Sequence, residues 1–140
     1  MKNYQIFNAY QSFEKLMSLN YSDYDINVDL ALMYMELEKR YNIITAMIHK
    51  LYGEFYAVEQ GQYVIDITGN YVLKPDKSQT DLNKELDKIS NADANYEPTK
   101  ITIYRDTLRD NLISPKDIVL LKDFIVFSKD TKSNYTGGEN

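Results

Sequence analysis

Apolar side chains spaced alternately four and three residues apart run without a break through the first half of this 140-residue chain. They are Leu30, Tyr34, Leu37, Tyr41, Ile44, Ile48, Leu51 and Phe55. A stripe with this spacing lies along one flank of an α-helix, and that flank must be buried. The sequence therefore predicts a long helix that Asn27 caps, with Asp29 in its first turn, and that ends at Tyr52 or Phe55.

A shorter helix is predicted over residues 3–19, with Asn3 as its N-cap, because apolar residues repeat the same spacing from Ile6 to Met17. The polar connection 20–27 is long enough to reverse the chain, so the two helices should form an antiparallel hairpin. The shorter helix can cover only the N-terminal part of the stripe. The rest of the stripe needs a β-layer or a second subunit, so we single out a candidate protein interface at Ile44, Ile48, Leu51 and Phe55.

The hydrophobic period changes after the long helix. Alternating apolar residues at 63–67 and an apolar run at 71–73 flank Gly69-Asn70, which predicts a β-hairpin that Pro75 ends. A short helix is predicted over 80–90 and a third strand over 100–108.

The last element is predicted from a local signal for a helix start. Ser114 supplies the cap, Pro115 the first helical residue and Asp117 the acid at the third, while Ile113 should pack on Ile118. This helix should end near Phe127. We therefore expect one α+β domain over residues 1–128, in which the helical hairpin packs on a small antiparallel β-sheet, followed by a mobile polar tail over 129–140.

Composition excludes several classes of function. The chain has no cysteine, so it forms neither disulfides nor thiolate zinc sites. Its net charge is −5 and its basic residues are dispersed, so we expect no nucleic-acid partner. No apolar run is long enough for a membrane span, and no signal peptide opens the chain, so no membrane association is expected.

A search for chemistry-bearing patterns predicts no enzyme, metal site or cofactor. The single histidine, His49, lies off the stripe and is expected to face solvent. Turn capping explains Asp23 and Asp25, and no glycine-rich phosphate loop is present. The 13 tyrosines are typical of interfaces, but AT-rich codon usage explains them equally well.

Several segments resemble a family of small uncharacterised bacteriophage proteins, in which a short helix precedes a long helix rich in Leu, Glu and Lys. The resembling segments are residues 6–16, 35–41 and 51–53 and the closing run from Ile113 to Phe124, and the resemblance spans most of residues 4–127. The family brings no catalytic residues to this chain.

The resemblance implies a protein that acts through protein–protein contacts or self-association as a homo-oligomer. It would be a virion or assembly component of a head, neck or tail. The alternative is an inhibitor of a host or anti-phage defence protein. In either role the protein would occupy the host cytoplasm during infection, and in the first it would also be found in the virion.

Overall fold

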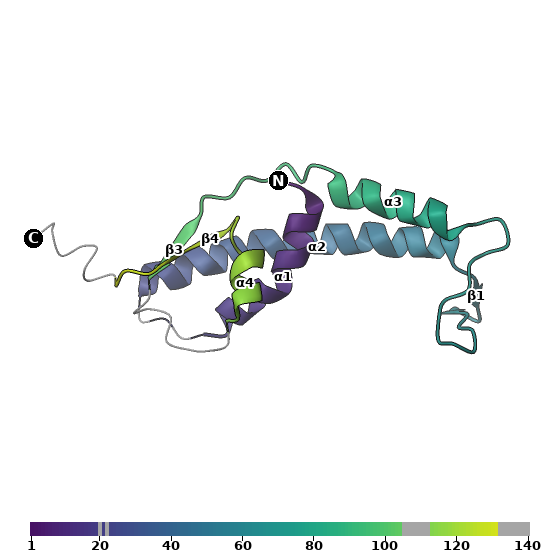
Figure 1. The fold of residues 1–140 in the computed structure, drawn as a ribbon, viewed down its shortest axis with the longest axis horizontal. Helices are drawn as coiled ribbons and strands as arrows, with labels where there is room; N and C mark the ends of the chain where they lie inside the picture. The colour runs from purple at the N-terminus through teal and green to yellow at the C-terminus, as the bar shows by residue number, and fades with distance from the viewer. Residues whose placement is uncertain (20, 22, 105–112, 132–140) are drawn as a thin grey trace, which may run out of the picture.

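One long helix, α2 (Tyr24–Phe55), forms the axis of an elongated molecule (Figure 1). The computed structural model describes residues 1–19, 21, 23–104 and 113–131. The remaining elements are α1 (Asn3–Met17), β1 (Val58–Glu59), β2 (Gln62–Tyr63), α3 (Gln79–Asn91), β3 (Ile101–Tyr104), α4 (Pro115–Leu120) and β4 (Ile125–Ser128). The predicted α+β class is confirmed. Parts of two predicted segments, residues 105–108 and 132–140, lie outside the described residues.

The helix α2 begins three residues before its predicted first residue. Its N-cap is Asp23, whose Oδ1 accepts hydrogen bonds from the backbone N–H groups of Asp25 at 2.9 Å and Ile26 at 3.3 Å. The prediction of Asn27 as the cap is therefore wrong, and Asp25, not Asp29, is the acid of the first turn. Asn27 instead donates its side-chain N–H to the Tyr21 carbonyl. Of the two predicted ends, Tyr52 and Phe55, the structure has Phe55.

The helix α1 packs antiparallel on the first half of α2, as predicted. Phe7 and Tyr10 of α1 stack on Tyr41, and the Tyr10 and Tyr41 ring centroids are 4.1 Å apart. Phe13, which is later in α1, stacks on Tyr34, which is earlier in α2, so the two helices run in opposite directions. The N-cap is Lys2 and not Asn3 as predicted. The Asn3 side chain instead donates to the Ile89 carbonyl at 2.9 Å, so it ties α1 to α3.

The helix α3 lies along the second half of α2 (Figure 1). Ser78 caps it by accepting a hydrogen bond from the Asp81 N–H, and Leu82 is completely buried against Leu51 and Phe55. Leu73 and the α3 residues Leu86 and Ile89 border the same cluster. A helix of the same chain therefore covers the part of the stripe for which we expected a β-layer or a second subunit.

Two turns fold the segment between α2 and α3. The strands β1 and β2 are antiparallel and join at Gln60-Gly61, both with positive φ. This turn was not predicted, because glutamine is not a residue typical of positive φ and Gln60 therefore gives no turn signal. The predicted turn at Gly69-Asn70 is present and closes a single bridge between Ile65 and Tyr71. This hairpin segment, residues 57–73, projects from the end of α2 (Figure 1).

The C-terminal region differs from its prediction. The Ser114 cap and the Pro115 start are confirmed, but α4 ends at Leu120 and not near Phe127. Residues 125–128 instead form β4, which runs parallel to β3 with Ile101 opposite Ile125. The β-branched and aromatic run Ile125-Val126-Phe127 favours a strand over a helix. Ile118, expected to pack on Ile113, is exposed.

Ile44 lies where α1, α2 and α3 meet and is only 4 % exposed. An Ile44→Asp substitution buries an unpaired charge and should destabilise the fold by roughly 3–5 kcal/mol. The same substitution at Ile67, which is fully exposed, should change stability by less than about 0.5 kcal/mol. Urea denaturation of both variants measures this, and equal unfolding midpoints would contradict the burial of Ile44.

Candidate interaction surfaces

The predicted interface on α2 is not an open surface. Ile44, Leu51 and Phe55 are 4 %, 8 % and 7 % exposed, and Ile48 is half-buried against the main core. The structure brings the four residues together on one flank, as the spacing predicted, but α3 covers that flank within the chain. The prediction that these side chains form an exposed interface for a partner is therefore corrected.

The chemistry-bearing residues do not assemble into a catalytic or metal centre within the described residues. His49 is exposed on α2, as predicted from its place off the stripe. No group of three His, Asp or Glu side chains in the described ranges is arranged to hold a metal ion. Among the described helices, none has both the length and the apolar character to cross a membrane.

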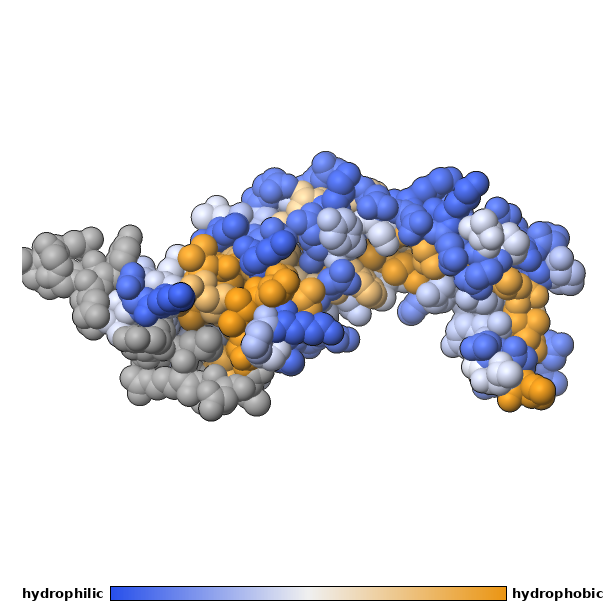
Figure 2. All heavy atoms as spheres, viewed as in Figure 1, coloured by the Kyte–Doolittle hydropathy of each residue, from blue (hydrophilic) through white to orange (hydrophobic). Residues whose placement is uncertain are grey.

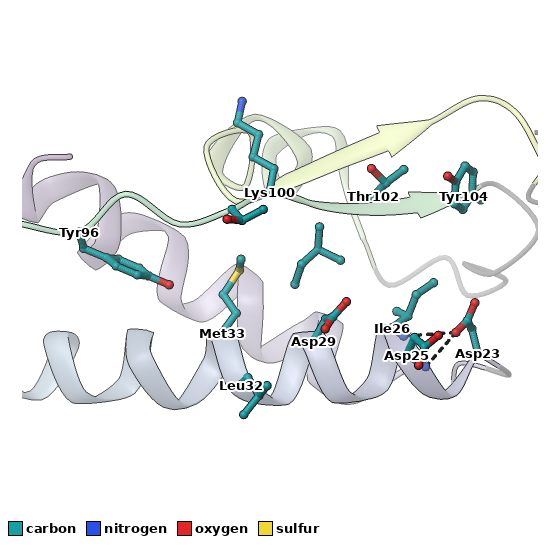
Figure 3. Close-up of a pocket in the computed structure, with 12 residues that line it drawn as sticks. Asp23, Asp25, Ile26, Asp29, Leu32, Met33, Tyr96, Lys100, Thr102 and Tyr104 are labelled. Carbon is teal, nitrogen blue, oxygen red and sulfur yellow. Dashed lines mark hydrogen bonds between the residues drawn. The ribbon is translucent and has the colours of Figure 1, made fainter.

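An open groove of about 450 Å³ lies between the start of α2 and the strand β3 (Figure 3). Its floor is apolar and includes Ile26 and Met33. Carboxylates of Asp23, Asp25 and Asp29 line the α2 side, although Asp23 also caps the helix. The side opposite is built from β3 and the chain before it, and it includes the cation Lys100 beside Thr102 and Tyr104. This groove combines an apolar floor with an acidic wall, which suits a basic segment of another protein.

Tyr96 closes one end of the groove and is held from behind by Arg40. The Arg40 guanidinium carbon lies 4.4 Å from the centre of the Tyr96 ring, and Arg40 donates to the Ala94 carbonyl at 2.6 Å. Burial, followed by the nearby Glu36 carboxylate, raises the pKa of Tyr96. The Tyr96 hydroxyl is therefore neutral at physiological pH, and it offers hydrogen bonding but no base.

A second surface is the outer face of α2, which we define as the side opposite the buried stripe. Five large apolar side chains are exposed there: Val28, Leu32, Met35, Ile43 and Met47. Leu32 is 59 % and Met35 65 % exposed, and Leu32 points away from β3 (Figure 3). This face was not predicted from the sequence, because the inner stripe was by itself enough to predict the helix. The four-three spacing of Val28, Leu32 and Met35 was the signal that could have shown it.

The third surface is the tip of the projecting hairpin segment, where apolar residues gather (Figure 2). Ile65 and Ile67 are exposed there. Asp66 fixes the turn, because its Oδ1 accepts hydrogen bonds from the Thr68 N–H and hydroxyl and from the Asn70 N–H. The Thr68 hydroxyl, with the Asn70 N–H next, lowers the pKa of Asp66. A structured turn thus presents Ile67 to the surroundings.

A buried carboxylate, Asp117, joins α4 to α1 and has a structural role. Its Oδ1 accepts a 2.7 Å hydrogen bond from the Ser12 hydroxyl, and its Oδ2 lies 3.0 Å from Lys15 Nζ. Oδ2 also accepts from the N–H and hydroxyl of Ser114. The Ser12 hydroxyl, with the Ser114 N–H next, holds the pKa of Asp117 well below its usual value, and burial opposes them.

Because folding lowers this pKa, ionised Asp117 stabilises the fold fully above the unfolded pKa of about 3.9, and this contribution decreases below that pH until it is lost at the lower pKa of the folded state. Asp117→Asn should destabilise the protein at pH 7 by about 1–3 kcal/mol. The difference in the free energy of unfolding between the wild type and this variant should be smaller at pH 3. Urea unfolding at both pH values measures it, with Asp87→Asn on the exposed side of α3 as the control. A difference that does not change with pH would contradict this role.

No protein-family model, curated protein or solved structure matches this chain.

Proposed function

We propose that this is a non-enzymatic bacteriophage protein that acts through protein–protein contacts, as a virion or assembly component of a head, neck or tail. The observation that carries the proposal is the outer face of α2, where five large apolar side chains lie in solvent along one helix. Exposed apolar residues grouped in this way are typical of surfaces that bind another protein.

The hairpin tip adds support for an assembly role. The hairpin segment projects at the end of α2 that is opposite the N-terminal part of the outer face (Figure 1), and within this segment Ile67 is exposed. A subunit or adaptor in a particle contacts more than one neighbour, and two separate apolar surfaces suit that arrangement. The buried inner stripe offers no such surface, since α3 covers it.

The groove favours a second candidate, an inhibitor of a host or anti-phage defence protein. Its acidic wall at Asp25 and Asp29 and the net charge of −5 complement a basic partner. In that role the groove, not the outer face of α2, would make the main contact.

Mass spectrometry of purified virions, combined with light scattering of the purified protein, tests the proposal. We expect the protein in the particles at a copy number consistent with a structural subunit, or in assembly intermediates isolated from infected cells. Its absence from both would contradict the assembly role. Capture of one basic host protein, lost on Asp25→Lys with Asp29→Lys but retained on Ile43→Asp, which changes the outer face and not the groove, would then favour the inhibitor.

A further inference from the structure

We propose that the partner of the outer face of α2 is the same face of a second copy, packed antiparallel to it. In this arrangement Asp25 lies opposite Lys50, Leu32 opposite Ile43 and Glu36 opposite Lys39, and each pair occurs twice about a two-fold axis. The inference rests on the proposed function, because it names the partner for the surface that carries it.

The outer face carries a second, unbroken four-three stripe. Its members are Asp25, Asp29, Leu32, Glu36, Lys39, Ile43, Ala46 and Lys50, and all eight are exposed. This stripe repeats the spacing of the buried stripe on the other side of the same helix. Five members of the stripe are charged, so a second helix would pack mainly on Leu32 and Ile43, with Val28, Met35 and Met47 beside the seam.

The order of charges along the stripe selects the antiparallel direction. All three carboxylates of the stripe are in its N-terminal half or at its centre, and both lysines follow them. A parallel pair would place Glu36 against Glu36 and Lys39 against Lys39, which is repulsive. In the antiparallel pair Glu36 faces Lys39 and Asp25 faces Lys50, while Leu32 and Ile43 form the apolar layers between them.

The charges needed for these contacts are available. In the part of the chain that the structure describes, Asp25, Lys39 and Lys50 form no ion pair. Glu36 has a contact of 3.6 Å with Arg40 and keeps about half of its side chain in solvent. Leu32 and Ile43 are 59 % and 54 % exposed, so an apolar partner would remove substantial surface from water.

Within the described residues, α1, α3 and β3 leave most of this side of α2 open, while its N-terminal members Asp25, Asp29 and Leu32 also border the groove beside β3. α1, α3 and β3 all pack on α2 through its buried residues, which include Leu30, Leu37, Ile44 and Leu51. Only Leu32 and Ile43 form large apolar layers in the seam, so we expect a reversible dimer whose affinity falls with added salt.

Charge reversal tests the register. Lys39→Glu alone, or Glu36→Lys alone, places like charges opposite each other and should weaken dimerisation roughly tenfold. The double variant Glu36→Lys with Lys39→Glu restores two opposite-charge pairs and should recover most of the affinity. Lys84→Glu, on the exposed side of α3, is the matched control and should have no effect. Sedimentation measures the affinity, and circular dichroism verifies that each variant is folded.

Cysteine cross-linking tests the direction, since the chain has no cysteine of its own. A mixture of Leu32→Cys and Ile43→Cys proteins should form a disulfide between the two variants. The Leu32→Cys protein alone should form few disulfide-linked dimers. Efficient disulfides between two Leu32→Cys chains would overturn the antiparallel arrangement. A wild-type protein that stays monomeric at high concentration would contradict the proposed dimer. If that monomeric protein were still detected in virions, the proposed function would not be contradicted.

Discussion

Burial of one flank of α2 is the constraint on which the rest of the structure depends. The helix has 32 residues, and its apolar stripe is too long for any one of the described elements that pack on it. α1 covers the first half through stacked rings at Tyr34 and Tyr41, and α3 covers the second half through Leu82. Each short element gains its stability from the shared helix, because an isolated helix of this length is marginal in water.

The two sides of α2 have different consequences. The inner stripe is closed by elements of the same chain, so it contributes to stability and leaves no surface for a partner. The outer stripe has the same spacing but mixes exposed apolar residues with charges of both signs. Its exposed apolar residues Leu32 and Ile43 belong to neither buried cluster, and this is why the proposed function and the proposed second copy both concern this side.

Local signals predicted most of the elements. The end of α2 at Phe55, the position of α3 and the Ser114–Asp117 cap follow from spacing and capping chemistry within a few residues. Errors arose where distant contacts decide. β4 forms beside β3, with Ile101 opposite Ile125, and no local signal predicts that partner. The cap of α2 is a local error instead, since Asp23 accepts hydrogen bonds from the backbone N–H groups of Asp25 and Ile26. The candidate interface failed for the same reason as β4, because the stripe shows that burial is needed but not that α3 provides it.

Amide hydrogen exchange followed by mass spectrometry tests most directly whether α3 closes the second half of α2. The exchange should be measured at a protein concentration at which the chain is monomeric. Residues 44–55 should then exchange about as slowly as residues 30–41, since both halves are covered within one chain. Rapid exchange across 44–55, with protection retained across 30–41, would contradict the account.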